Sequence, residues 1–489
     1  MQQLIPAYIQ QQLLAGQLNG RITAFTLNID LSGFTALTED LMKQGSQGAE
    51  KMSVILNEIF EPLVALVYRN GGFIPYFAGD AFTAVFPLPP DTSHAIHLLH
   101  TADEARRIFR ERDNPFGGQF TIGIKAGIAQ GNVEFGIVGD ELKAFYFRGA
   151  AIDSAADCQS LAKDQDIVID QMMNLLISDR PITTVEVTTN SFLLLGPIDG
   201  EKTTVKSLNL PVIDADIAQS FLPAVVVNNE QSGEFRTVIS CFLAFENLTN
   251  HEELSALADI TLDHSLNFGA YFKEVDFGDK GGLMAIFFGA PISYENAVIR
   301  ALEFALTVRE ECNELQKTHP DFQFRMGLTM GTAFTGMVGG KERCQYACVG
   351  NRVNLAARIM SSANWGEILL DEELAQANAF ECKPKGKTKY KGISTATSTF
   401  SLIGRMQNVG KPTYEGPMIA REEECGRLLK FTNQVLNSET GGLVYVYGEA
   451  GIGKSRTTHE LRRQLKQKHP RLSWQLCPCD QILKKPSNA

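Results

Sequence analysis

The chain has 489 residues, a formal net charge of −11 and a hydrophobic content of 44%, and its length allows roughly three domains. The negative net charge argues against a nucleic-acid-binding protein, because no basic surplus is available to neutralise phosphates. Binding of a small anionic ligand is still possible, because a local site can be positive on an acidic protein. The nine cysteines have no zinc-type spacing and no apolar run reaches the roughly 20 residues of a membrane span, so we expect reduced thiols and a cytoplasmic location.

Residues 26–40, TLNIDLSGFTALTED, form the first informative stretch. A β-like segment ends on Asp30, and a turn rich in small residues then opens a helix. The structural explanation is that Gly33 makes the turn and Ser32 or Thr35 caps the helix. The chemical explanation is that a carboxylate beside the free N–H groups of a helix start holds a metal-bound phosphate.

The chain then repeats itself at a spacing of about 200 residues. GGFIPYFAGDAFTAVFP (71–87) resembles VDFGDKGGLMAIFFGAP (275–291), and FYFRGAAIDSAADCQSLA (145–162) resembles YACVGNRVNLAARIMSSA (346–363). This spacing is typical of tandem domains. The order in each copy is strand, helix, hairpin, helix, strand and a loop into a helix, which predicts two ferredoxin-like α+β domains. Such copies can pair as a pseudo-twofold dimer with pockets at their interface.

The two copies differ in their polar residues. The first has Asp30 at a strand end and Asp80 at a hairpin tip, and the second has Asn354 and Arg358 on one helix face. The segment that matches Asp30 in the second copy has no aspartate. One composite site would therefore take carboxylates from the first copy and Asn and Arg from the second. Drift between two structural domains is the alternative explanation.

A second motif follows a Gly/Pro-containing linker (402–417). GEAGIGKS matches the P-loop pattern between a predicted strand, LVYVYG, and a predicted helix. Backbone N–H groups from Gly448 to Gly453 would cradle phosphates, Lys454 would reach the β/γ-phosphates and Ser455 a Mg²⁺ ion. About 35 residues follow the motif, too few for a complete α/β domain. We therefore expect the start of a P-loop NTPase domain without hydrolysis.

These patterns predict six segments. They are residues 1–20, a helical lead-in without the features of a signal peptide; 21–205, the first repeated domain; 206–234, a linker; 235–404, the second repeated domain; 405–420, a second linker; and 421–489, the N-terminal fragment of the P-loop domain.

IDLSGFTALTEDL, FAGDAFTAVF and VGNRVNLAARI occur in this order and resemble the class III nucleotidyl cyclases. The tandem arrangement followed by an NTPase is similar to the soluble adenylyl cyclases. The resemblance implies conversion of ATP to 3′,5′-cyclic AMP and pyrophosphate at one site between the two domains. It also implies two divalent ions, Mg²⁺ or Mn²⁺, on Asp30 and Asp80, with the Leu31 carbonyl as a further ligand.

The resemblance extends to the substrate. It implies that the turn Ser32, Gly33, Phe34 and Thr35 cradles the terminal phosphates. It further implies that Asn354 orients the ribose and that Arg358 stabilises charge at the α-phosphate. The structural alternatives are a helix cap for Asn354 and a surface salt bridge for Arg358.

The base-recognition positions differ from the adenylyl pattern. Alignment places Glu274 where a lysine that contacts adenine is usual, with Lys273 one residue earlier, and places Ala347 at the second base contact beside Cys348. Lys273 favours ATP and Glu274 favours GTP. Both side chains cannot face one pocket unless a β-bulge intervenes. We predict ATP, with GTP as the alternative.

The degenerate site of bicarbonate-stimulated relatives uses a lysine and an arginine of the first copy. Tyr76 and Ala156 occupy these positions, with Lys143 and Arg148 only nearby in the sequence, so we do not expect bicarbonate stimulation.

The sequence is compatible with three function classes, of which an active cyclase is the first. The others are a catalytically silent nucleotide- or ligand-sensing dimer and an NTPase scaffold with a cyclase-like regulatory head.

Overall fold

The computed structural model describes residues 3–110, 122–198, 200–207, 215–228, 233–278, 281–377, 379–390, 396–406, 418, 420–436, 443–447 and 453–469. The chain divides into two compact units, Met1–Met406 and Gln407–Ala489. Within the described ranges, no helix has both the length and the apolar character needed to cross a bilayer.

The first half of the first unit is an eight-stranded sheet in the order β2-β3-β1-β4-β6-β8-β7, with β5 paired to β4. Its strands are β1 (Asn19–Ser32), β2 (Phe77–Ala78), β3 (Ala81–Phe86), β4 (Gly123–Val138), β5 (Ala144–Arg148), β6 (Ile167–Asp170), β7 (Thr183–Thr188) and β8 (Ser191–Leu195). Its helices are α1 (Ala7–Leu14), α2 (Phe34–Met42), α3 (Ser46–Arg69), α4 (Thr92–Arg110), α5 (Ala150–Leu161) and α6 (Gln171–Leu176).

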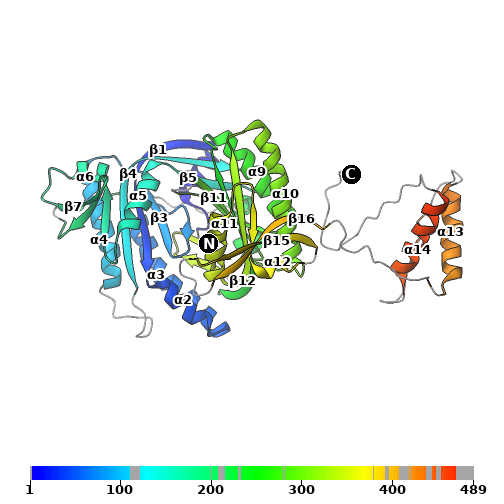
Figure 1. The fold of residues 1–489 in the computed structure, drawn as a ribbon. Helices are drawn as coiled ribbons and strands as arrows, with labels where there is room; N and C mark the ends of the chain where they lie inside the picture. Colours follow the sequence, from blue (N-terminus) through cyan, green and yellow to red (C-terminus); the bar gives the residue numbers. More distant parts are fainter. Residues whose placement is uncertain are drawn as a thin grey trace. The chain divides into compact units, whose positions relative to one another are not determined.

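The second half repeats this order as β10-β11-β9-β12-β14-β16-β15, with β13 paired to β12. Its strands are β9 (Glu234–Glu246), β10 (Tyr271–Gly278), β11 (Gly281–Phe288), β12 (Gln323–Gly339), β13 (Cys344–Val349), β14 (Ile368–Leu370), β15 (Phe380–Thr388) and β16 (Thr397–Arg405). Its helices are α7 (Ala215–Phe221), α8 (Ala224–Val227), α9 (His251–Phe268), α10 (Ala297–Thr318), α11 (Asn351–Ser362) and α12 (Glu372–Ala375). Figure 1 shows α9 and α10 side by side against this sheet.

The sequence repeat is therefore a structural repeat, and the predicted tandem α+β fold is confirmed. The expectation of a loop directly before the helices α5 and α11 is wrong. In its place, β5 and β13 fold back on β4 and β12 as hairpins. Local patterning did not reveal them, because each of these strands is short and pairs only along the far end of a long neighbour.

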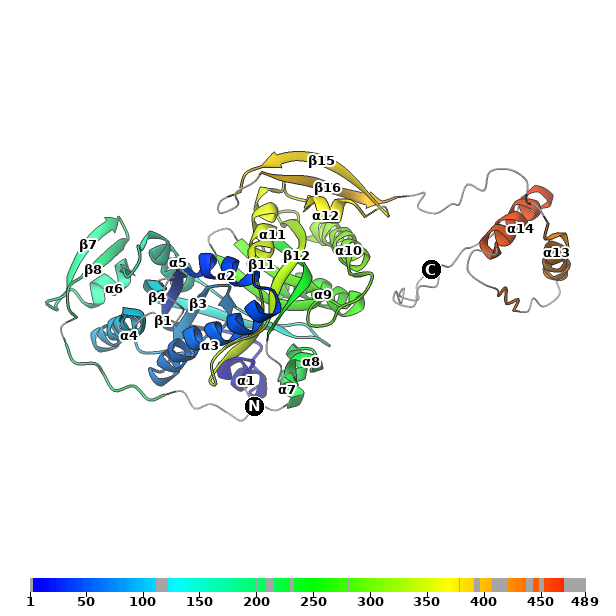
Figure 2. The same ribbon diagram turned by 90° about the horizontal axis from the view of Figure 1, so that it is seen from below.

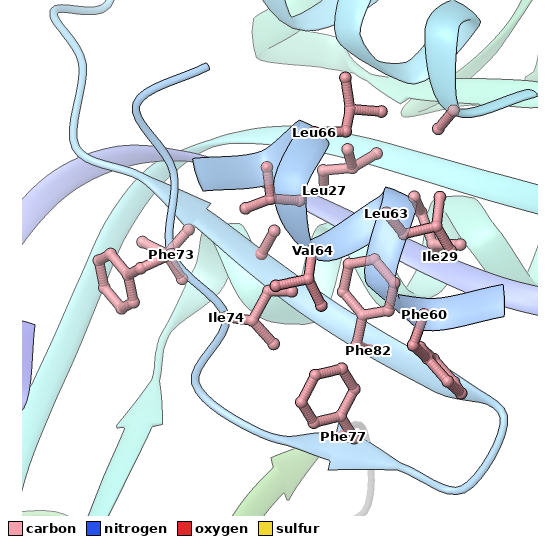
Figure 3. Packing of buried hydrophobic residues seen from close by; sticks show 14 of the residues in the cluster. Leu27, Ile29, Phe60, Leu63, Val64, Leu66, Phe73, Ile74, Phe77 and Phe82 are labelled. Atoms are coloured by element: carbon pink, nitrogen blue, oxygen red, sulfur yellow. The ribbon is translucent and has the colours of Figure 1, made fainter. Parts of the chain in front are cut away.

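The core of the first copy lies between α3 and the sheet. Phe60 and Val64 on one face of α3 pack against Leu27 and Ile29 of β1 and against Phe82 of β3 (Figure 3). The spacings of four residues in the helix and two in the strand bring apolar side chains to a common face. This packing holds the end of β1 and the β2–β3 hairpin together.

The two copies interlock through their second hairpins. Tyr146, from the β4–β5 hairpin, is buried in the core of the second copy. Phe334 and Val338, from β12, are buried in the core of the first. In the same reciprocal way, α3 packs on β12 and α9 packs on β4. The face-to-face pairing expected from the repeat is thus present within the first unit.

Arg343, between β12 and β13, is fully buried where three segments meet. Its guanidinium donates to the carbonyl oxygens of Leu4 at 2.8 Å, Ile74 at 3.1 Å and Pro75 at 2.7 Å, and also to that of Cys344. The fork of five donors in arginine suits such multiple contacts. Arg343 thereby ties the N-terminal segment and the approach to β2 to the second copy.

We expect Arg343→Met to lower the thermal stability of the first unit by several degrees. Each buried carbonyl left without a donor costs about 1–3 kcal/mol. Differential scanning calorimetry measures the change. The control is Arg21→Met, because Arg21 is 64% exposed and pairs with Glu134 at the surface, where such pairs contribute about 0–1 kcal/mol. Equal shifts in both variants would contradict the assigned role.

The second unit contains α13 (Glu422–Leu436) and α14 (Lys454–Lys468), which pack on one another (Figure 2). The helix α14 confirms the helix that was predicted after the P-loop motif. The predicted strand is wrong for the described structure: residues 443–447 belong to no strand, because nothing in the described ranges pairs with them. Gly453 has φ +102° at the start of α14, a conformation that favours glycine. Gly448 and the side chain of Ser455 lie outside the described residues.

Candidate functional site

Asp30 and Asp80 meet because the end of β1 lies beside the tip of the β2–β3 hairpin. Asp30 is paired with Ala81 in the β1–β3 ladder, and the N–H of Leu31 donates to the backbone carbonyl of Asp80 at 3.1 Å. Gly79 has φ +69° at the hairpin tip. Glycine adopts this left-handed conformation without steric cost, which permits the tight turn. The structure thus brings together two carboxylates that are 50 residues apart in the chain.

Both carboxylates lie in an environment that disfavours negative charge. Burial raises the pKa of Asp30, while Lys125 and Gln159 oppose this rise. Burial, with the added negative charge of Asp30, raises the pKa of Asp80 to about 6. A shared cation would stabilise the ionised form of two such carboxylates, which are partly desolvated and repel each other.

The donor set fits a divalent ion of the Mg²⁺ type. Asp30 and Asp80 supply the hard carboxylate oxygens that Mg²⁺ and Mn²⁺ prefer. Over the described part of the chain, no group of three or more His, Cys, Asp or Glu residues could hold a metal by itself. The remaining ligands would therefore come from a phosphate and from water, as Mg²⁺ commonly takes them.

The helix after Asp30, α2, begins at Phe34, and its N-cap is Gly33, which has φ +82°. The expectation that Ser32 caps this helix is wrong, because the Ser32 hydroxyl donates to Asp164 instead. Within the described residues, no side-chain cap is present at the N-terminus of α2, so the first N–H groups of the helix are suited to an anion. The side chain of Thr35 lies outside the described residues.

A cleft of about 170 Å³ opens next to these groups and draws on both copies. Its lining includes Phe34, Thr38 and Asp80 from the first copy and Glu274, Asp276 and Asn354 from the second. Arg358 lies one turn after Asn354 on α11 and is partly buried. Of the predicted composite set, Asp80 and Asn354 line this cleft, whereas Asp30 and Arg358 are not part of its lining.

Lys273 and Glu274 both line this cleft. A bulge in the β10–β11 ladder, between Phe272 and Glu274, makes this possible, since an extra residue interrupts the alternation of a strand. The Lys273 ammonium donates to the Phe77 carbonyl at 2.9 Å and pairs with the Glu274 carboxylate. The two side chains therefore both lie at the cleft and form an ion pair.

Gln345 completes this network. Its amide donates to Glu274 at 3.2 Å, and its carbonyl oxygen accepts the Phe77 N–H at 3.1 Å. Ala347, the predicted second base contact, is buried in a core cluster and does not line the cleft. Its neighbour Cys348 lines the cleft instead, because successive residues of β13 point to opposite faces.

Two cations of the β4–β5 hairpin, Lys143 and Arg148, are held by protein groups. Arg148 donates to the carbonyls of Leu248 and Thr249 and pairs with Glu134. Lys143 donates to the Asp140 carbonyl at 2.6 Å. Tyr76 is buried and hydrogen-bonds Asp276, whose pKa burial raises to about 6. Ala156 lies in α5.

Three residues at the site were not anticipated, namely Lys125, Asp276 and Gln345, and Cys348 was considered only as the neighbour of Ala347. Lys125 is the most informative, because it interrupts the apolar strand GIKAGIA. A charged residue within an apolar strand marks an unusual position. Its proximity to Asp30, however, follows only from the register of β1 against β4, in which Asp30 and Lys125 are partners.

Comparison with known families and proteins gives a consistent result. Residues 21–200 and 278–404 match the adenylate and guanylate cyclase catalytic domain, and residues 417–487 match an AAA ATPase domain. Adenylate cyclase type 10 from Oryctolagus cuniculus is 25% identical over 491 residues, and that from Homo sapiens is 25% identical over 488. Each alignment covers 88% of this chain and 30% of the relative, so the chain spans about a third of their length.

One solved structure resembles both copies together. A class III adenylyl cyclase-like ATP-binding protein from Pseudomonas aeruginosa aligns with 73% of this chain and 85% of its own, at 12% identity and a TM-score of 0.51. This likeness concerns the fold alone.

Proposed function

Because this chain belongs to the family of adenylate and guanylate cyclase catalytic domains, we propose that it converts ATP to 3′,5′-cyclic AMP and pyrophosphate at the cleft between its two copies. One observation carries the proposal: Asp80 of the first copy and Asn354 of the second line the same cleft, with Asp30 beside Asp80. The presence of Asp30, Asp80, Asn354 and Arg358 in one chain favours an active cyclase over a catalytically silent sensing module.

In the proposed reaction, the ribose 3′-oxygen attacks the α-phosphorus and the bond to the β-phosphate oxygen breaks. The hydroxyl proton is released and pyrophosphate leaves. No covalent enzyme intermediate is required, so the protein acts through positioning and electrostatics. Asn354 orients the ribose, Arg358 donates to the α-phosphate as charge develops there, and the N–H groups at the start of α2 hold the terminal phosphates.

Asp30 and Asp80, with the Leu31 carbonyl, would hold two divalent ions. The chemistry that such ions supply is a lower pKa for the attacking hydroxyl and neutralisation of phosphate charge. The raised pKa of Asp80 and the absence of a third acidic or thiol ligand in the described structure support a site that binds its ions together with the substrate.

We propose ATP as the substrate, since Lys273 in the cleft can donate to N1 of adenine and the matched relatives are named adenylate cyclases. GTP is the second candidate. Glu274 can accept from N1–H and the 2-amino group of guanine, and Cys348 lies in the same cleft.

The test is incubation with ATP or GTP plus Mg²⁺ or Mn²⁺, with identification of cyclic products by mass spectrometry. We expect cyclic AMP as the main product, and we expect Lys273→Ala to lower kcat/KM for ATP about tenfold or more, because an unpaired buried group costs about 1–3 kcal/mol. Glu274→Ala is the matched variant. Chiefly cyclic GMP from the wild type, with that preference lost in Glu274→Ala, would replace the adenylyl assignment by a guanylyl one. No cyclic product with either nucleotide would overturn both.

For the second unit we propose phosphate binding at the P-loop. Lys454 is the first residue of α14, directly after the left-handed Gly453, an arrangement that suits a phosphate at a helix N-terminus.

A further inference from the structure

A lysine stands against the carboxylate at the end of β1. Lys125 of β4 is the register partner of Asp30, and its ammonium lies 3.6 Å from the Asp30 carboxylate. Gln159 of α5 donates to the same carboxylate oxygen at 3.3 Å. Two side chains thus hold Asp30, but only Lys125 does so with a positive charge.

The second copy provides an internal comparison. Arg325 of β12 occupies the equivalent register position, but its partner on β9 is Ala244. Arg325 donates to the carbonyls of Ser361 and Ala363 and lies over the Trp365 ring. A cation therefore occurs at this strand position in both copies, and it faces a carboxylate only in the first.

We propose that Lys125 is a resident counter-cation of Asp30, which competes with divalent ions for this carboxylate and so sets the metal concentration that the site requires. The inference rests on the proposed function, because it takes Asp30 as a metal ligand. A divalent ion held by Asp30 would carry the same sign of charge as the Lys125 ammonium, and the two would repel each other. The flexible stem of lysine lets the ammonium leave without movement of β4, while Gln159 keeps Asp30 oriented.

The experiment measures Mn²⁺ binding to the whole chain, by electron paramagnetic resonance of free Mn²⁺, in the presence of 3′-deoxy-ATP, which cannot cyclise. We expect Lys125→Met to bind Mn²⁺ about three- to tenfold more tightly than the wild type, since one nearby positive charge is removed. Lys125→Arg, which keeps the charge, and Arg325→Met, which removes the equivalent cation of the second copy, are expected to bind like the wild type.

Unchanged or weaker Mn²⁺ binding by Lys125→Met would overturn the proposal, and so would equal tightening in Arg325→Met. Asp30→Asn separates this failure from failure of the proposed metal site. If Asp30→Asn loses Mn²⁺ while Lys125→Met binds like the wild type, only the counter-cation role fails. If Asp30→Asn binds Mn²⁺ like the wild type, the metal site itself is wrong.

Discussion

Replacing Asp30 or Asp80 by asparagine is expected to lower cyclic nucleotide formation by at least about 10²–10³-fold, the cost typical of removing one charge-stabilising group from an active site. Asparagine keeps the shape of the side chain but not its charge. Because no group of three or more His, Cys, Asp or Glu residues in the described structure could hold a metal, the loss of either carboxylate would leave the divalent ions under-ligated. The measurement is turnover of ATP and GTP over a range of Mg²⁺ and Mn²⁺ concentrations.

The control for this pair of variants is Asp263→Asn, on an exposed position of α9, which is expected to keep wild-type turnover. Thermal unfolding checks that the first unit stays folded in all three proteins. Near wild-type activity with normal metal dependence in either Asp30→Asn or Asp80→Asn would remove that residue from the metal site.

Replacing Arg358 by methionine is expected to lower kcat by about 10²–10³-fold with little change in KM. A donor that acts on charge developing at the α-phosphate contributes in the transition state more than in the ground state. Steady-state kinetics separates the two parameters. Asn354→Ala is expected to lower kcat as well, through loss of ribose orientation.

Arg352 is the matched control for Arg358, since it lies on the same helix and carries the same charge. It pairs with Glu373 and Asp371, away from the proposed chemistry. Arg352→Met is therefore expected to affect stability more than turnover. If Arg358→Met and Arg352→Met lose activity equally, the role of Arg358 is structural.

The tandem architecture could be predicted from local patterns in the sequence, and so could a composite site. Segments that recur at a spacing of about 200 residues indicated the tandem repeat, and the identical strand orders confirm it. The complementary loss of Asp30-type and Arg358-type residues predicted one site rather than two. These conclusions were accessible because strand ends, hairpin tips and helix faces follow from short-range patterns.

Which side chains face the cleft depends on the three-dimensional fold. The bulge that presents both Lys273 and Glu274 exists in the pairing of β10 with β11, and the alternation of β13 places Cys348 rather than Ala347 in the lining of the cleft. Ser32 bonds to Asp164, and Lys125 faces Asp30. Each of these facts depends on the register between segments far apart in the chain. A shift of one residue in that register moves a side chain to the opposite face of the sheet, and a local pattern carries no record of the register.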